Sequence, residues 1–294
     1  MPSAGELAWR LRLPTPIHEA GKAALTGFGT VTASLRTLPD YLIIGVQRGG
    51  TTSLSRYLGA HPSEQSSMHK EIHYFDLNYE RGEAWYRGHF PTRAYRRLVA
   101  ARMGLSVTGE ASPYYVFHPL APRRAAQLLP NAKLIVLLRD PVDRAISHYH
   151  HSRRRGVERL SLEEALDREG ERIAGQEERI EREPRYDSPS HRYFSYVARG
   201  MYARQLQRWL DLYPREQVLV LESSRFRDET EKEFLRVLGF LGLSTFRMEE
   251  FKQHNSKQHE AADEGTVKRL ADLFRPHNED LYDLLGEDFG WNTR

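Results

Sequence analysis

A short apolar run that ends in a glycine-rich loop does most to limit how this chain can fold. Residues 41–46 are typical of a buried parallel strand, and residues 51–58 read as a helix that Gly59 and Pro62 end. The loop between them, Gly45-Val-Gln-Arg-Gly-Gly-Thr-Thr52, directs backbone N–H groups and a helix N-terminus at one concavity. Such a concavity favours an anion, most naturally a phosphate.

Strand and helix patterns alternate through the rest of the chain. Further strands are predicted at 105–108, 134–138 and 217–221, and helices at 118–128, 141–155, 200–212, 228–240 and 263–285. This alternation predicts an α/β fold with a P-loop-like, mostly parallel central sheet flanked by helices on both faces. We expect residues 1–38 to form an irregular lead-in and residues 39–294 to form a single domain.

Residues 153–190 differ from the rest of the chain because they are dense in Arg and Glu and poor in large apolar side chains. The plainer interpretation is a solvated helix with ion pairs between residues four apart. The alternative is a lid or an insertion that faces an acceptor.

Composition excludes several classes of protein. The 294 residues include no Cys, so disulfides, thiolate catalysis and Cys-based metal sites are excluded, and a reducing compartment fits. No run approaches the roughly 18 apolar residues of a membrane span, and no signal-peptide core is present. The net charge of +3 suits an anionic ligand without the basic tract of a nucleic-acid arm. We expect a bacterial, cytoplasmic protein with no nucleic-acid partner, whose first 38 residues contact a membrane at most peripherally.

Position 51 distinguishes the loop from a nucleotide-triphosphate loop. Gly45, Gly50 and Thr52 meet the G-x-x-x-x-G-K-[ST] spacing, but Thr51 stands where a triphosphate loop has Lys. The positive charge lies at Arg48 instead. One phosphate that carries a transferable group fits this loop better than a triphosphate with magnesium, and a purely structural loop is the alternative.

Two further segments carry polar side chains suited to the same chemistry. In Lys70-Glu-Ile-His-Tyr-Phe-Asp76, Glu71 is a carboxylate of the kind that takes a proton from an attacking hydroxyl. In the second segment a buried strand ends at Arg139, and Ser147 follows nearly two turns along a helix opened by a proline. Arg offers phosphate a planar fork of donors and Ser adds a hydroxyl. An Arg paired with a neighbouring Asp is the structural alternative.

Together these segments resemble the PAPS-dependent sulfotransferases, and are closest to the branch that sulfates heparan sulfate at N- and 3-O-positions. The match is specific at residues 42–52, although that branch usually carries Lys where this chain has Arg48. The likeness extends over about residues 41–292. It implies an enzyme that moves a sulfuryl group from 3'-phosphoadenosine-5'-phosphosulfate (PAPS) to a hydroxyl or amine, leaves 3'-phosphoadenosine-5'-phosphate (PAP), and requires no metal.

The resemblance also implies roles for individual residues. Glu71 is expected to be the catalytic base, Arg48 to stabilise charge on the leaving phosphate, and His151, one turn beyond Ser147, to assist catalysis. His73 is expected to contact substrate. The nucleotide-binding candidates are Gln47, Arg48, Gly49, Gly50, Thr51, Thr52, Arg139, Ser147, Tyr202 and Lys257, with Lys252 as the alternative to Lys257.

The acceptor is expected to be carbohydrate-containing or a small molecule. Heparan sulfate itself is not implied, because Ala111 stands where the 3-O branch has a Lys near the sulfate. Two other functions stay open at this point. A P-loop kinase or other phosphotransferase would need Lys at position 51 and a strand-end Asp for magnesium. A non-catalytic anion- or nucleic-acid-binding protein would show salt-sensitive binding.

Overall fold

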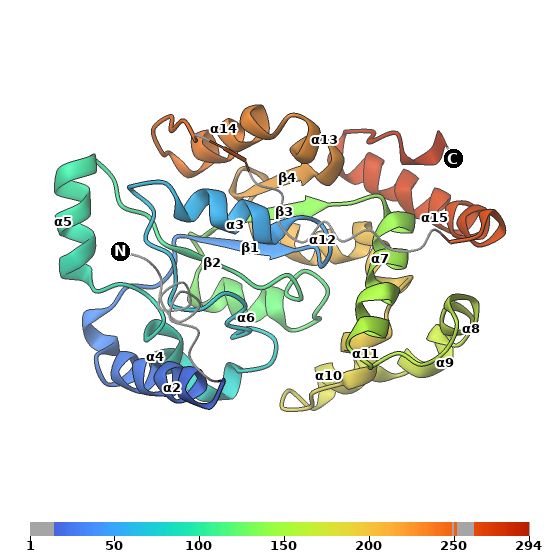
Figure 1. Ribbon diagram of the computed structural model, residues 1–294, viewed down its shortest axis with the longest axis horizontal. Helices are drawn as coiled ribbons and strands as arrows, with labels where there is room; N and C mark the ends of the chain where they lie inside the picture. Colours follow the sequence, from blue (N-terminus) through green and yellow to red (C-terminus); the bar gives the residue numbers. More distant parts are fainter. Residues whose placement is uncertain (1–14, 249, 252–261, 294) are drawn as a thin grey trace.

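Four parallel strands lie at the centre of the molecule (Figure 1). A computed structural model of the chain describes residues 15–248, 250–251 and 262–293. The strands are β1 (Tyr41–Gly45), β2 (Gly109–Ala111), β3 (Lys133–Leu138) and β4 (Val218–Glu222), in the order β2-β1-β3-β4. All neighbouring pairs run parallel, which confirms the predicted sheet.

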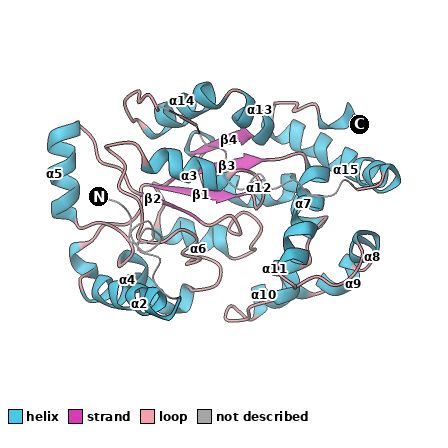
Figure 2. Cartoon of the chain, viewed as in Figure 1, coloured by secondary structure: helices cyan, strands magenta, loops and turns pink. Residues whose placement is uncertain are grey.

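Helices cover both faces of this sheet (Figure 2). Successive side chains of a strand point to opposite faces, so each strand contributes to two cores. Leu42 and Val136 belong to the core on the side of α6 (Ala121–Leu128) and α12 (Tyr202–Leu210). Ile43 and Ile135 belong to the core on the side of α3 (Thr51–Gly59) and α14 (Thr230–Leu241). A third core joins α7 (Pro141–Arg154), α8 (Leu162–Asp167) and α15 (Glu264–Leu285) beyond the ends of the strands.

The helices follow the strands in the order that the sequence pattern predicts, with additional short ones between them. The α-helices are α2 (Thr15–Val31), α3 (Thr51–Gly59), α4 (Gly82–Arg87), α5 (Arg93–Met103), α6 (Ala121–Leu128), α7 (Pro141–Arg154), α8 (Leu162–Asp167), α9 (Glu169–Ile173), α10 (Gln176–Arg182), α11 (Pro189–Tyr193), α12 (Tyr202–Leu210), α13 (Ser223–Asp228), α14 (Thr230–Leu241) and α15 (Glu264–Leu285). The 3₁₀ turns are η1 (Ala33–Leu35), η2 (Tyr79–Arg81), η3 (Ala198–Gly200), η4 (Arg215–Gln217) and η5 (Trp291–Thr293).

The carboxyl ends of the strands meet at one edge of the sheet, where ligands bind in open α/β folds. The loop after β1 leads into α3, and the end of β3 leads into α7. Asp140 fixes the start of α7, because its carboxylate accepts hydrogen bonds from the amides of Val142 (2.9 Å) and Asp143 (3.1 Å). Both phosphate-type motifs of the sequence therefore lie at the same edge.

The second strand lies later than predicted. Residues 105–108 were expected to form it, but the ladder with β1 begins where Tyr41 pairs with Gly109. Asp40 explains the boundary, since its amide donates to the carbonyl of Thr108 (2.7 Å) and its carboxylate accepts from the amide of Thr108 (2.7 Å). Gly109 in turn packs beneath the ring of Tyr41, where a side chain would collide.

The structure adds two helices that the sequence did not predict. The lead-in is not irregular throughout, because residues 15–31 form α2, which crosses α4 where Gly29 meets Gly88 without room for a Cβ. The helix predicted at 228–240 is confirmed as α14 (Thr230–Leu241), but α13 (Ser223–Asp228), which precedes it, was not predicted. None of the helices in the described part of the chain is long and apolar enough to cross a membrane.

The charged segment 153–190 is four short helices, α8 to α11, rather than one. Gly175 interrupts it with a left-handed backbone (φ 67°), and Ser161 begins α8 with a capping box. Its charged side chains also form contacts between segments, because Arg172 of α9 pairs at 2.6 Å with the buried carboxylate of Glu158, which precedes α8. The segment is thus a folded insertion with its own buried contacts.

The packing of Gly109 predicts the effect of adding a single methyl group. Gly109→Ala should lower the free energy of unfolding by about 1–3 kcal/mol, because the new Cβ overlaps the buried Tyr41 ring. Gly239→Ala in α14 is the matched control, since that position has open space and helical backbone, and it should be neutral or stabilising by up to about 1 kcal/mol. Urea unfolding of both variants tests this, and equal effects would contradict it.

Candidate active site

The glycine-rich loop is shaped by its backbone. Gly50 has φ 102°, a conformation that strongly favours glycine, and it precedes the first turn of α3 at Thr51. Gly49 lies so close to the carbonyl oxygen of Leu137 that a Cβ would meet it at 2.5 Å. The hydroxyl of Ser223 donates to the Gly49 carbonyl (2.9 Å). The loop is therefore held by β3 and by the first residue of α13. The amide of Ser53 donates to the Gly50 carbonyl (3.0 Å), whereas the amides of Thr51 and Thr52 have no backbone partner within α3.

Arg48 joins this loop to α7. Its Nε donates to the hydroxyl oxygen of Ser147 (2.9 Å), although the two residues are 99 positions apart in the chain. Arg139 Nη1 donates to the carbonyl oxygen of Arg48 (3.2 Å). The structure thus brings together the loop residue, the strand-end arginine and the helix serine that the sequence pointed to separately.

Tyr202 lies behind this group rather than in contact with open space. Its side chain is buried, and its hydroxyl donates to the carbonyl oxygen of Arg139 (2.7 Å). Arg139 Nη2 lies 3.9 Å from Asp143, so the pairing with a neighbouring Asp that the sequence left open is present as a long contact. Tyr202 therefore acts on the site through the position of Arg139.

Positive charge accumulates beside the loop. Burial, together with the nearby guanidinium groups of Arg154 and Arg139, lowers the pKa of Arg48 from its ordinary value. These guanidinium groups repel one another, and an anion bound among them would offset the repulsion. The arrangement is that of an anion site at a helix N-terminus.

The segment that carries Glu71 reaches the same edge of the sheet. The amide of Glu71 donates to the carbonyl of Ala111 at the end of β2 (3.1 Å). Lys70 Nζ lies 2.6 Å from the Thr52 hydroxyl oxygen and 3.2 Å from Glu71 Oε1. Lys70 therefore bridges the start of α3 and the carboxylate of Glu71.

Glu71, His73 and Asp76 form a row of alternating charges. His73 Nε2 lies 3.8 Å from Glu71 Oε2, and His73 Nδ1 lies 2.7 Å from Asp76 Oδ2. Burial alone lowers the pKa of His73, but hydrogen bonds and charge from Asp76 and Glu71 outweigh it and raise the pKa to about 10. The contact with His73, aided by Lys70 and against the effect of burial, lowers the pKa of Glu71 to about 2. Glu71 is thus a carboxylate and His73 an imidazolium at neutral pH.

Backbone strain is concentrated in the same place. Among the described residues, the non-glycine residues with positive φ are Arg48 (73°), Glu71 (59°) and His73 (54°). Such conformations persist only where the surroundings impose them, and they cluster at functional sites. For His73 the surroundings include Ser112, whose hydroxyl oxygen accepts from the His73 amide (3.1 Å) and whose hydroxyl donates to the buried Glu110 (2.7 Å).

His151 lies on α7 within the electrostatic reach of both halves of the site. Burial, then the charges of Arg48 and the neighbouring arginines, lowers the pKa of its imidazole, while Glu71 acts in the opposite direction. The pKa of His151 is therefore shifted in the opposite direction from that of His73. His148, one turn earlier, is fully buried and packs against Tyr196.

The sequence reasoning missed several residues that hold the site together. Asp76 and Lys70 flank Glu71 in the same motif, so their proximity was visible in the sequence. Arg199 donates to the side-chain oxygen of Gln47 (2.7 Å), and Ser223 holds Gly49, but neither lies near the loop in the chain. Lys257 and Lys252 lie outside the described residues. Among the described residues, no group of three His, Asp or Glu side chains is placed to hold a metal ion.

The charge row predicts how the pKa of Glu71 responds to loss of the imidazolium. His73→Asn keeps a residue type that tolerates positive φ but removes the charge, so the pKa of Glu71 should rise from about 2 towards the usual 4.5. An NMR titration of ¹³C-labelled Glu carboxyl groups, assigned with Glu71→Gln, measures this. His277→Asn on α15 is the control and should leave the Glu71 titration unchanged; no shift in His73→Asn would refute the charge row.

Comparison with known proteins adds four findings. Residues 38–270 match the family model described as the sulfotransferase domain. The chain is 30% identical to heparan sulfate glucosamine 3-O-sulfotransferase 6 of Mus musculus over 87% of this chain and 75% of that protein. It is 28% identical to membrane-associated sulfotransferase kil1 of Dictyostelium discoideum over 90% of this chain and 68% of that protein. A solved sulfotransferase from Alicyclobacillus acidocaldarius is 32% identical, with a TM-score of 0.64, and the match covers 88% of this chain and all of that one.

Proposed function

The chain belongs to the sulfotransferase domain family and is a sulfotransferase, and we propose that it moves the sulfuryl group of PAPS to a hydroxyl or amine of a carbohydrate-containing or small-molecule acceptor. One observation carries the proposal for this chain's own residues. Arg48 of the loop lies 2.9 Å from Ser147 of α7, and Arg139 contacts the Arg48 carbonyl. This contact lets one ligand engage the loop and α7 together.

The donor spans these elements in the proposal. The amides of the loop and the first turn of α3 bind the 5'-phosphate, helped by the hydroxyls of Thr51 and Thr52. Arg139 and Ser147 bind the 3'-phosphate, the group that distinguishes PAPS from ATP. The cations around Arg48 favour an anion, and Arg48 stabilises the charge that builds on the bridging oxygen as the phosphate leaves.

Transfer is an in-line displacement at sulfur. The acceptor oxygen or nitrogen forms a bond to sulfur while the bond from sulfur to the 5'-phosphate oxygen breaks, and that oxygen keeps the electron pair as PAP leaves. The acceptor proton passes to Glu71, which is ionised at neutral pH. A carboxylate held by His73 and Lys70 is a weak base in the free protein, so the proposal has the acceptor take up part of these contacts when it binds. Positioning and electrostatics supply most of the rate.

Several observations support the acceptor class and the setting of the enzyme. The mouse relative is named for heparan sulfate, which supports a carbohydrate acceptor. The absence of Cys supports a reducing compartment such as the bacterial cytoplasm. Leu25, Phe28 and Val31 are exposed on α2, and a relative is named membrane-associated, so we keep a peripheral membrane contact in the proposal.

Binding of the 3'-phosphate predicts a difference between two nucleotides. Arg139→Ala should weaken PAP by about 10- to 100-fold, the value of one or two charge-assisted hydrogen bonds, and Ser147→Ala by about 3- to 10-fold. Neither change should alter the weak affinity for 5'-AMP, which lacks the 3'-phosphate. Calorimetric titration of the wild type and both variants measures this. A wild-type protein that prefers ATP with magnesium over PAP would favour the phosphotransferase alternative.

Proton removal by Glu71 predicts a separation of turnover from nucleotide affinity. Glu71→Gln should lower kcat by about 10²- to 10⁴-fold with any acceptor that the wild type sulfates, since the amide cannot take the proton. Its affinity for PAP should stay within about twofold of the wild type. Radiolabel transfer from [³⁵S]PAPS and calorimetry give the two values. A variant that loses PAP binding, or that turns over normally, would show that Glu71 is not the base.

A further inference from the structure

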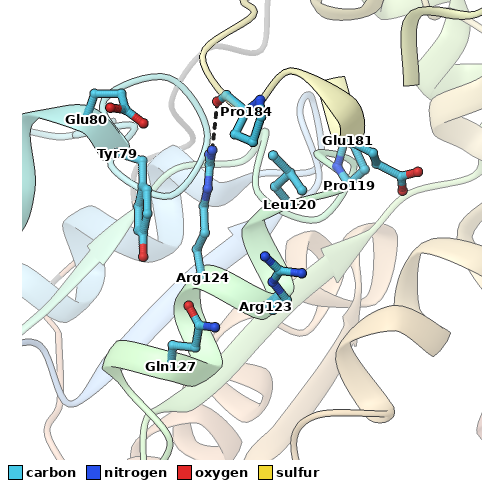
Figure 3. A pocket seen from close by; sticks show the side chains of 9 residues that line it. All are labelled: Tyr79, Glu80, Pro119, Leu120, Arg123, Arg124, Gln127, Glu181 and Pro184. Atoms are coloured by element: carbon cyan, nitrogen blue, oxygen red, sulfur yellow. Dashed lines mark hydrogen bonds between the residues drawn. The ribbon is translucent and has the colours of Figure 1, made fainter. Parts of the chain in front are cut away.

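A pocket of about 410 Å³ is lined by the residues that Figure 3 labels. Its walls come from three places in the chain: Tyr79 in η2, α6 with Arg123, Arg124 and Gln127, and the insertion near Pro184. The volume falls in the range of about 300–1,000 Å³ that is usual for ligand pockets. No residue of the proposed donor site lines it.

Arg124 builds one wall and connects it to the proposed active site. Its Nη1 donates to the carbonyl oxygens of Phe75 (2.9 Å) and Asp76 (3.2 Å), and its Nη2 donates to that of Pro184 (2.8 Å). Its guanidinium also lies 4.5 Å from the centre of the Tyr79 ring. Since the carboxylate of Asp76 contacts His73, the pocket wall and the charge row share one residue. These hydrogen bonds hold the wall in place, and the guanidinium of Arg124 already has its partners within the protein.

Arg123 differs from Arg124, because its positive charge has no partner among the described residues. Its side chain is exposed, and no described residue forms a hydrogen bond or ion pair with it. The two carboxylates of the pocket do not neutralise it: Glu80 pairs with Arg185 (2.9 Å), and the Glu181 carboxylate points away from Arg123 in Figure 3. Gln127 offers an amide beside it. Arg123, whose charge has no partner among the described residues, therefore lines one cavity with the Gln127 amide and the Tyr79 ring. Arg124 and the carboxylates of Glu80 and Glu181 complete its polar lining.

This set of groups fits a sugar that carries one negative charge. Arg binds a carboxylate or sulfate through its planar fork, a neutral amide exchanges hydrogen bonds with hydroxyls, and the Tyr79 side chain adds apolar contact. We infer that the pocket is a second acceptor subsite, which binds an anionic sugar unit beyond the one that is sulfated. The inference rests on the proposed function, because it takes an oligosaccharide as the acceptor. It gives the insertion 153–190 a role as one wall of that subsite.

Binding of a defined oligosaccharide tests the inference. The probe is a fluorescently labelled hexasaccharide of alternating glucuronate and N-acetylglucosamine, followed by anisotropy without nucleotide. Arg123→Ala should weaken its binding about tenfold and Gln127→Ala about threefold. Arg97→Ala removes an exposed arginine from α5, outside the pocket, and should change the affinity by less than twofold. Neutral cellohexaose should compete poorly.

Three outcomes would overturn the inference: no binding of the hexasaccharide to the wild type, equal binding to Arg123→Ala, or displacement by hexaglutamate as effective as by unlabelled hexasaccharide. The last would make the pocket a site for acidic peptides. PAP titration of the same variants keeps the two proposals apart. Unchanged PAP affinity in Arg123→Ala is expected, whereas failure of PAP to bind the wild type would refute the proposed donor site and leave the hexasaccharide result to stand alone.

Discussion

The contact between Arg48 and Ser147 is the interaction on which the rest of the site depends. It connects the loop after β1 to the helix after β3 by a hydrogen bond of 2.9 Å. Because β1 and β3 are parallel neighbours, their carboxyl ends are adjacent, and the two motifs need only short loops to meet. The glycines of the loop and the buried strand residues therefore serve one purpose, which is to hold an arginine and a serine at a fixed separation at the edge of the sheet.

The base segment is held to that edge by charge and strain. Glu71 and His73 both have left-handed backbones, and the row from Lys70 through Glu71 and His73 to Asp76 alternates in sign. Buried support comes from Glu110, whose carboxylate accepts from the hydroxyls of three neighbouring residues, Tyr86, Tyr115 and Ser112. Glu71 is therefore charged and oriented before an acceptor arrives, which lowers the reorganisation that the reaction requires.

Much of the fold and part of the site could be predicted from local patterns. The strands β1, β3 and β4 are apolar runs in buried positions, and the loop and Arg139 follow directly from such runs. The strand β2 was misplaced because Gly109-Glu-Ala111 has no strand-like side chains and is defined by its packing on Tyr41. Arg199 was missed for a related reason, since only the folded chain brings it to Gln47. Tertiary contacts of single residues are not encoded in a periodic pattern.

The central claim is that one nucleotide engages the loop and α7 together, and a crystal structure of the protein with PAP tests it most directly. The account predicts the 5'-phosphate against the amides at the start of α3 and the 3'-phosphate within hydrogen-bonding distance of Arg139 and Ser147. It also predicts an open space beside Glu71 where the acceptor binds. PAP bound elsewhere, or bound at the loop with its 3'-phosphate in solvent, would contradict the account.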